Sequence, residues 1–203
     1  MKIICIGRNY ADHAKELNNP VPEKPVFFMK PSTALLMPHN PFYYPDFTKE
    51  LHYETEIVLK INKNGKCIQP QFAGDYFQEI TVGIDFTARD LQDECKKKGL
   101  PWEIAKAFDS SAPVGKFVDK SRFSDLSRVN FGLKINSEWK QQGNASDMIF
   151  PFDKIISYVS QFVSLKQGDL IFTGTPAGVG PTQINDHFEL FLEDEKLLSF
   201  HVK

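Results

Sequence analysis

The distribution of proline does most to limit how this chain can fold. Seven of its 13 prolines lie between residues 20 and 47, in runs such as Pro20-Val21-Pro22 and Pro38-His39-Asn40-Pro41. Proline lacks an N–H group and its ring collides with the preceding helical turn, so a regular helix is excluded from this region. We expect a long loop around one short apolar strand at residues 26–29, and we hypothesise that the loop forms a lid.

The remaining chain is patterned mainly for strands. Residues 51–61 alternate between apolar odd positions and mostly polar even positions, which predicts a β-strand. A second apolar strand is expected at 80–86, followed by a helix over about 88–98 that Thr87 or a residue next to it caps and Gly99 closes. Further strands are expected near the N-terminus and around 129–135, 170–174, 188–192 and 197–202, with helices at 9–17, capped by Asn9, and 155–163. Because strands dominate and do not alternate regularly with helices, we predict an α+β, β-rich fold.

Length and charge narrow the function classes. The 203 residues predict one domain, 1–203, and the formal net charge of −2 gives no basic excess with which to bind nucleic acid or an anionic membrane. No uninterrupted apolar run reaches 18 residues, so we expect no membrane span. The N-terminus does not resemble a signal peptide, and the three scattered cysteines suit free thiols in a reducing compartment. We therefore expect a cytoplasmic protein.

Three carboxylates form a candidate metal site. Glu54 and Glu56 lie two residues apart on the predicted strand and share one face, and Asp85 stands in the other strongly apolar strand. A carboxylate in such a strand is costly unless it is paired. An all-oxygen ligand set selects a hard cation, Mg²⁺ first and Mn²⁺ or Ca²⁺ next. The alternative from spacing alone is a solvated strand face.

Other residues suit acid–base chemistry or anion binding. His13 and Glu16 stand at i, i+3 on the first helix, so the pair is either a water-activating base or a surface pair. Arg8, Lys30, Arg89 and Lys106 adjoin apolar segments and are either surface cations or clamps for an anionic substrate. The glycine-rich loop at 174–180 either binds an anion such as a carboxylate or forms a hairpin turn.

Taken together, these segments resemble the fumarylacetoacetate hydrolase family, in particular its short single-domain acylpyruvase and oxaloacetate decarboxylase members. The matching segments are Gly7-Arg8-Asn9-Tyr10-Ala11-Asp12-His13, Phe28-Met29-Lys30-Pro31-Ser32, His52-x-Glu54-x-Glu56, the stretch from Thr87 to Trp102 that follows Asp85, and Gly174-Thr175-Pro176-x-Gly178-Val179-Gly180. The resemblance runs from about residue 3 to residue 202. It implies a β-rich roll of mixed sheets and a homodimer. Family members from eukaryotes carry an N-terminal extension for mitochondria, which this chain does not show, and that again favours a cytoplasmic location.

The resemblance also implies a role for each matching residue. Glu54, Glu56 and Asp85 would hold Mg²⁺ or Mn²⁺, and His13 with Glu16 would activate water. Lys30 and Lys106 would stabilise developing negative charge. Arg89 and Gln92 would orient the substrate, with Arg8 as a further substrate-binding residue, and Thr175 would bind the substrate carboxylate.

The implied activity is a metal-dependent hydrolase that cleaves the C3–C4 bond of acylpyruvates (2,4-dioxo acids) through a pyruvate enolate held by the metal. Decarboxylation and tautomerisation of oxaloacetate pass through the same enolate, so one site would serve all three reactions. Within the family, the alternative is a hydratase, isomerase or decarboxylase of 2-oxo-dienoate intermediates. Outside enzymology, the alternative is a binding protein or structural dimer on the same fold.

Overall fold

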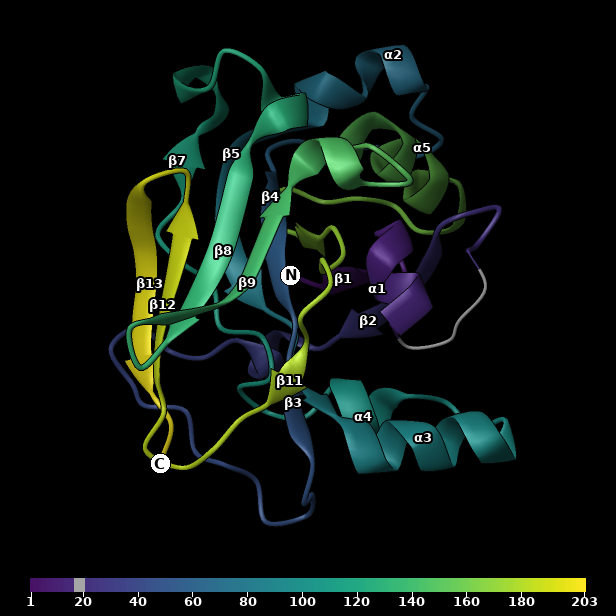
Figure 1. The fold of residues 1–203 in the computed structure, drawn as a ribbon. Helices are drawn as coiled ribbons and strands as arrows, with labels where there is room; N and C mark the ends of the chain where they lie inside the picture. The colour runs from purple at the N-terminus through teal and green to yellow at the C-terminus, as the bar shows by residue number, and fades with distance from the viewer. Residues whose placement is uncertain (17–20) are drawn as a thin grey trace.

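A computed structural model describes residues 1–16 and 21–203 of the protein (Figure 1). The end of the first predicted helix, at residue 17, and Pro20 of the predicted loop lie outside the described residues. The strands are β1 (Ile3–Gly7), β2 (Val26–Lys30), β3 (Leu51–Tyr53), β4 (Thr55–Ile61), β5 (Phe77–Ile84), β6 (Thr87–Ala88), β7 (Val118–Asp119), β8 (Asn130–Ile135), β9 (Glu138–Asn144), β10 (Leu170–Phe172), β11 (Gly180–Pro181), β12 (His187–Leu192) and β13 (Glu195–His201). The α-helices are α1 (Ala11–Glu16), α2 (Pro70–Ala73), α3 (Arg89–Lys98), α4 (Glu103–Lys106) and α5 (Phe152–Phe162).

The strands form three sheets, one of them mixed. The largest has six strands in the order β2-β1-β10-β4-β5-β7, in which β1 and β10 run parallel while the other neighbours run antiparallel. A four-stranded antiparallel sheet has the order β13-β12-β8-β9, and a small sheet has the order β11-β3-β6. The predicted class, an α+β and β-rich fold with a mixed sheet and a few short helices, is confirmed.

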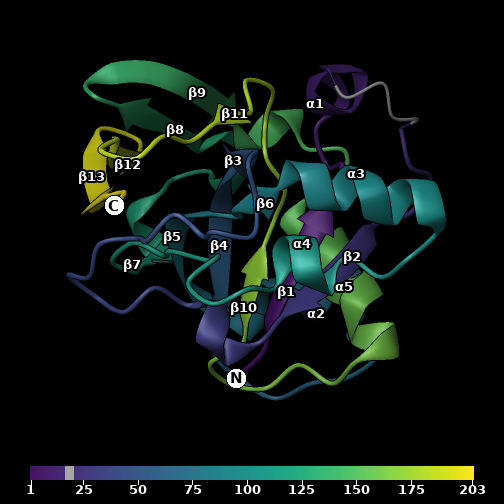
Figure 2. The same cartoon turned by 90° about the horizontal axis from the view of Figure 1, so that it is seen from below.

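Helices cover the sheets at the periphery. The four-stranded sheet stands on the left of Figure 1, α2 and α5 lie together at the top, and α3 and α4 lie at the lower right. Figure 2, seen from below, shows α3 close to β6 and β3, and these elements are in contact. Within the described residues, no helix has the combined length and apolar character required to cross a bilayer.

The central strands are buried on both faces. On β1, Ile4 and Ile6 join the main hydrophobic cluster, while Ile3 and Cys5 point the other way into a second, smaller cluster. This two-sided burial follows from the period-2 geometry of a strand and explains why β1 reads as a continuous apolar run. β4 shows the same division: Ile57, Leu59 and Ile61 join the main cluster and Val58 joins the smaller one, but Glu56, on the same face as Val58, is polar.

Two details of the prediction were wrong. The expected strand at 51–61 is two strands in different sheets, because the chain changes partners at Glu54. β9 was missed, because its sequence Glu138–Asn144 contains no apolar alternation. The helix at 89–98 has its N-cap at Ala88, next to Thr87 as expected, and the Thr87 hydroxyl donates to the Asp85 carbonyl oxygen.

The proline-rich region behaves as an extended connection. The predicted strand at 26–29 is confirmed as β2, and the chain after it pairs with the C-terminus through a parallel bridge between Phe42 and Val202. Between residues 21 and 47, Phe28 alone of the described residues lines the pocket detailed below. The hypothesis of a lid therefore gains no support from the position of this loop.

Candidate active site

A pocket lies at one end of the six-stranded sheet, where several strand ends meet. β4 runs antiparallel to β10 and β5, so its beginning lies beside their ends. The Asp85 N–H donates to the Glu54 carbonyl oxygen at 2.8 Å, and the Gly174 N–H donates to Oε2 of Glu56 at 2.6 Å. The sheet register therefore brings residues from three separate strand ends to one place.

Gly174 adopts a backbone conformation that few other residues tolerate. Its φ is 102°, and a Cβ at this position would lie 2.6 Å from the Cβ of Asn9. The Asn9 amide donates to the carbonyl oxygens of Thr173 and Phe150 at 2.8 and 3.0 Å. Because α1 begins at Ala11 and the Asn9 side chain is used in this way, the predicted helix cap at Asn9 was wrong.

Glu54, Glu56 and Asp85, hereafter the acidic triad, converge as the sequence predicts. All three are buried, and one carboxylate oxygen from each lies within 4.8 Å of the others. Nζ of Lys106 lies 2.8 Å from both Glu54 Oε2 and Asp85 Oδ2. Nζ of Lys30 lies 2.8 Å from Asp85 Oδ1 on the other side. The triad is therefore a buried charge cluster partly balanced by lysines.

Burial and these charges together lower the pKa of Glu54 and raise the pKa values of Glu56 and Lys106. Burial opposes ionisation of Glu54, but Lys106 and Arg89 outweigh it and lower the pKa of this carboxyl group. Burial and the neighbouring Asp85 carboxylate raise the pKa of Glu56 well above its ordinary value. Burial also opposes the charge on Lys106, but Asp85 and Glu54 outweigh it, so the pKa of the ammonium group is raised.

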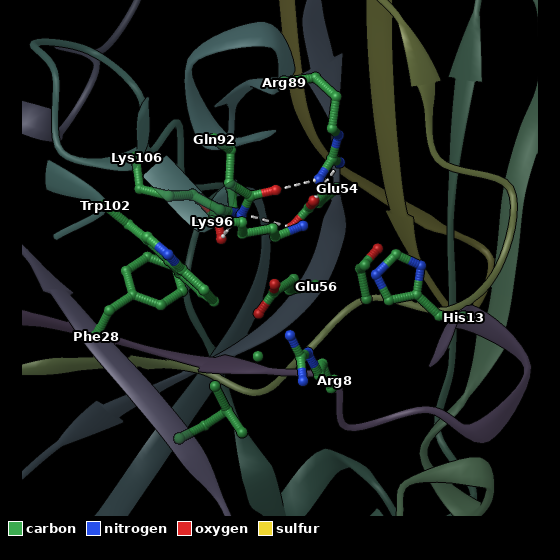
Figure 3. A pocket seen from close by; sticks show the side chains of 14 residues that line it. Arg8, His13, Phe28, Glu54, Glu56, Arg89, Gln92, Lys96, Trp102 and Lys106 are labelled. Carbon is green, nitrogen blue, oxygen red and sulfur yellow. Dashed lines mark hydrogen bonds and ion pairs between the residues drawn. The ribbon is translucent and has the colours of Figure 1, made fainter. Parts of the chain in front are cut away.

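Arg89 and Gln92 bring α3 into the site. The Arg89 guanidinium donates to Glu54 Oε1 from one nitrogen and to Gln92 Oε1 from the other, both at 2.6 Å. Arg89 opens α3 and Gln92 follows three residues later, so the two side chains share one face of the helix. This pairing orients the guanidinium toward the triad (Figure 3).

Thr175 is held by a residue that the sequence did not single out. Nε2 of Gln141 donates to Thr175 Oγ1 at 2.9 Å and to the Pro176 carbonyl oxygen at 3.0 Å. Oε1 of the same amide accepts the Thr55 N–H at 2.9 Å. Gln141 lies on β9 and is buried. Its segment carries no apolar or motif signal from which this role could have been found.

His13 and Glu16 form the expected pair, with Nδ1 and Oε2 separated by 3.2 Å. Among the described residues, His13 Nε2 has no hydrogen-bond partner. The Gly178 N–H donates to Glu16, with N to Oε1 at 3.1 Å. At Gly174 and Gly178, the loop N–H groups donate to two different carboxylates of the protein itself, so binding of a substrate carboxylate by this loop stays a prediction.

Most of the predicted site residues line one pocket, and two do not. The lining residues that the sequence predicted are Arg8, His13, Glu54, Glu56, Asp85, Arg89, Gln92, Lys106 and Thr175. Glu16 stands behind His13 with its side chain one-third exposed. Lys30 is fully buried one layer behind the pocket, where it contacts Asp85, Ser111 and the Phe86 carbonyl oxygen. Lys30 therefore contacts Asp85 and does not line the pocket, and its role in stabilising developing negative charge stays a prediction.

The pocket also contains residues that were not predicted as site residues. Phe28 and Trp102 form an edge-to-face pair with ring centroids 6.0 Å apart, which gives the pocket one apolar wall. Lys96 lines the pocket from α3, although the sequence suggested only a helix-ending cation. Arg8 has a left-handed backbone with φ of 58°, a conformation that costs a non-glycine residue about 1–2 kcal/mol. Strain of this kind is concentrated at functional positions.

The donor set fits a hard divalent cation. The triad offers three carboxylate oxygens and, among the described residues, no sulfur or imidazole ligand joins the cluster. Three buried carboxylates repel one another; Lys106, Lys30 and Arg89 pair with Glu54 and Asp85, whereas Glu56 forms no ion pair with these cations. Oxygen-only sites of this kind suit Mg²⁺, Mn²⁺ or Ca²⁺.

Comparisons with known proteins agree with the resemblance. A family model described as "Fumarylacetoacetate (FAA) hydrolase C-terminal" matches residues 2–203. The chain is 46% identical over 201 residues to the oxaloacetate tautomerase FAHD1, mitochondrial, of Mus musculus, covering 99% of this chain and 91% of that protein. It is 41% identical to an oxaloacetate decarboxylase, mitochondrial, of Dictyostelium discoideum, covering 90% and 84%.

A solved structure gives the same answer. The fumarylpyruvate hydrolase from Pseudomonas aeruginosa, in complex with Mn²⁺ and pyruvate, superposes with a TM-score of 0.93 at 36% identity, covering 100% of this chain and 89% of that one. Sequence, fold and the convergence of the motif residues thus agree, and the chain belongs to the fumarylacetoacetate hydrolase family.

Proposed function

We propose that this protein is a divalent-metal-dependent enzyme that stabilises the enolate form of short 2-oxo acids, with oxaloacetate tautomerisation as its main reaction. The observation that carries the proposal is the buried acidic triad in a pocket that also contains Lys106, Arg89 and His13. Two relatives act on oxaloacetate by name, which supports this substrate.

Each group in the pocket has a chemical task in this proposal. Glu54, Glu56 and Asp85 would hold Mg²⁺ or Mn²⁺, which when bound supplies Lewis-acid stabilisation of negative charge on the substrate oxygens. The ammonium group of Lys106 adds a fixed positive charge beside the same oxygens, in a site where burial strengthens electrostatic interactions.

The substrate is positioned and deprotonated by other residues. The Thr175 hydroxyl, held by Gln141, and the guanidinium of Arg89 would bind the C1 carboxylate. His13 would move the proton between C3 and the substrate oxygen through Nε2, because Glu16 occupies Nδ1 and fixes the tautomer.

The test is the rate at which enol-oxaloacetate is converted to the keto form, followed by ultraviolet absorbance with Mg²⁺ present. Wild type should accelerate the conversion, and Glu54→Gln should lose at least about a hundredfold in kcat/KM, because it removes a carboxylate from the triad. Glu79→Gln is the matched control, because the Glu79 side chain is 40% exposed and pairs with Lys60 outside the triad, and it should keep wild-type activity. A Glu54→Gln enzyme as active as wild type would refute the proposal. A wild-type enzyme that catalyses neither tautomerisation of oxaloacetate nor hydrolysis of acylpyruvates would refute it too.

Hydrolysis of acylpyruvates is a second candidate, favoured by the His13–Glu16 pair and by the likeness to a fumarylpyruvate hydrolase. In that reaction the pair would deprotonate a water that attacks the C4 carbonyl, and the C3–C4 bond would break to release pyruvate and a carboxylic acid.

The two activities respond differently to loss of the imidazole. His13→Ala should abolish release of pyruvate from acetylpyruvate while decarboxylation of oxaloacetate falls much less, because decarboxylation needs no activated water. Pyruvate formation measured for both substrates checks this. Equal losses in the two reactions would show that His13 does not act as the base for water.

A further inference from the structure

Two cationic side chains line the pocket without pairing to the acidic triad. Arg89 and Lys106 are bound to triad carboxylates by ion pairs, whereas Arg8 and Lys96 are not. Among the described residues, Arg8 forms no ion pair or hydrogen bond through its side chain. The ion pair of Lys96 is a 3.7 Å contact with Asp93, whose side chain is 53% exposed. These two cations are therefore available to a ligand.

The position of Lys96 on α3 is not that of an ordinary surface lysine. Arg89, Gln92 and Lys96 stand at i, i+3 and i+7, so they share the face of α3 that lines the pocket. The Lys96 side chain is 29% exposed, against 61% for Lys98 two residues later. In the view of Figure 3, Lys96 and Arg8 extend toward the space around Glu56 from different sides.

The surroundings of Lys96 disfavour its positive charge. Burial, followed by the guanidinium groups of Arg89 and Arg8, lowers the pKa of its ammonium group. The repulsion between like charges that line one pocket is relieved when an anion binds between them. The repulsion therefore favours a negatively charged group of the ligand at this position.

The charge of the whole pocket agrees with this reading. Four cationic side chains and three carboxylates line it, so a bound divalent ion leaves three formal positive charges. A 2-oxo monocarboxylic acid neutralises one of them and a 2-oxo dicarboxylic acid neutralises two. In a partly buried site, this difference favours the dianion.

We propose that Lys96 and Arg8 form a second carboxylate subsite, which makes the protein selective for short 2-oxo dicarboxylic acids over monocarboxylic acids of equal length. The inference rests on the proposed function, in which the first carboxylate binds beside Thr175 and Arg89. It adds Lys96 as a specificity-determining residue, which would bind the second substrate carboxylate together with Arg8.

The test compares ligands that differ only in the terminal group. For the five-carbon pair, binding of 2-oxoglutarate and of 2-oxopentanoate is measured by calorimetry in the presence of Mn²⁺. For the four-carbon pair, the KM for oxaloacetate is compared with the inhibition constant of 2-oxobutanoate. Wild type should bind the diacid about tenfold or more tightly than its monoacid counterpart, a preference that weakens as salt is added.

Substitutions then locate the preference. Lys96→Gln and Arg8→Asn should each reduce the ratio of the monoacid Kd to the diacid Kd to below about threefold. Asparagine is chosen at position 8 because it tolerates the left-handed backbone of Arg8. Lys96→Arg should keep the preference, which separates the charge from any effect on folding. Lys97→Gln, on the exposed neighbouring lysine, removes the same formal charge and should leave the ratio unchanged.

The outcomes distinguish this inference from the proposed function. The proposed subsite would be refuted if wild type bound monoacid and diacid equally well at both chain lengths. It would also be refuted if Lys96→Gln and Lys97→Gln changed the ratio of monoacid to diacid Kd equally. Binding is measured without turnover, so a diacid preference in a protein with no catalytic activity would refute the proposed function and leave the subsite standing.

Discussion

Gln141 shows how a single side chain connects the pocket to the sheet that supports it. Its amide group donates to Thr175 and Pro176 and accepts from the Thr55 backbone, and its exposed fraction is only 2%. A buried amide whose hydrogen bonds are all made fixes the atoms that it contacts. The hydroxyl of Thr175 is therefore held in place from the opposite sheet.

We predict that Gln141→Leu destabilises the protein by about 1–3 kcal/mol, because the buried Thr55 N–H loses its acceptor. Denaturation in urea measures the change. Gln142→Leu is the matched control, since its side chain is exposed on the other face of β9, and it should change stability by less than about 0.5 kcal/mol. Equal effects of the two substitutions would show that the hydrogen bonds of Gln141 carry no special weight.

At the scale of elements, the end of α3 is set by one glycine. Gly99 has φ of 65°, and its N–H closes the last turn on the carbonyl oxygens of Cys95 and Lys96. Left-handed backbone at this position is the usual way to end a helix. Because α3 presents Arg89, Gln92 and Lys96 to the pocket, its length also defines one wall of the site.

Gly99→Ala should cost about 1 kcal/mol of stability. A Cβ would meet no atom within 4 Å, so the cost is that of the left-handed backbone alone. Gly74→Ala provides the comparison: its surroundings are equally open, but its φ is −57°, and the substitution should be neutral or stabilising by up to about 1 kcal/mol. Urea denaturation of both variants checks the difference, and identical results would exclude the backbone argument.

The elements that the sequence predicted are those with a one-dimensional signal. The alternation around Ile57 and the apolar run of β1 are visible in the sequence because burial imposes period 2 on a strand. β9 has no such signal, because its buried residue Gln141 is polar and makes hydrogen bonds to other segments. The break at Glu54 depends on two sheets that meet in space, which no local pattern records.

In the site too, residues with a local sequence pattern could be predicted, whereas contacts that depend on how elements pack could not. The acidic triad could be proposed because Glu54 and Glu56 lie two residues apart in an alternating segment and Asp85 interrupts an apolar run. Lys96 was read as a helix-ending cation, because its direction depends on how α3 docks. The contact of Lys30 with Asp85 could not be predicted, because it depends on how β2 packs against the end of β5.

At the scale of the whole molecule, the near-neutral net charge of −2 conceals a concentrated charge pattern. Three carboxylates are buried together and lysines surround them, so stability depends on what balances that cluster. The homodimer, the cytoplasmic location and the organisation of residues 1–203 as one domain stay predictions.

Metal binding should therefore stabilise the fold. At about a hundred times its Kd, Mg²⁺ should add about 2.7 kcal/mol, which corresponds to a rise in Tm of roughly 5–10 °C. Glu56→Gln should lose this rise while being at least as stable as wild type without metal, since it removes one buried negative charge beside Asp85.

Thermal melting with and without Mg²⁺ measures both effects, and Glu79→Gln, on β5 with a side chain 40% exposed, should keep the full rise. An undiminished rise in Glu56→Gln would exclude Glu56 from the metal site.

The position of β10 in the six-stranded sheet has a consequence for synthesis of the chain. β10 lies between β1 and β4, so it separates two strand pairs, β1 with β2 and β4 with β5, that form from nearby residues. During translation these pairs leave the ribosome before residues 170–172. Until β10 follows, the backbone N–H and C=O groups on the facing edges of β1 and β4 stay unpaired. Open edges of this kind recruit other chains. A transcript truncated before β10 should therefore yield an aggregating or rapidly degraded product, not a partly active fragment.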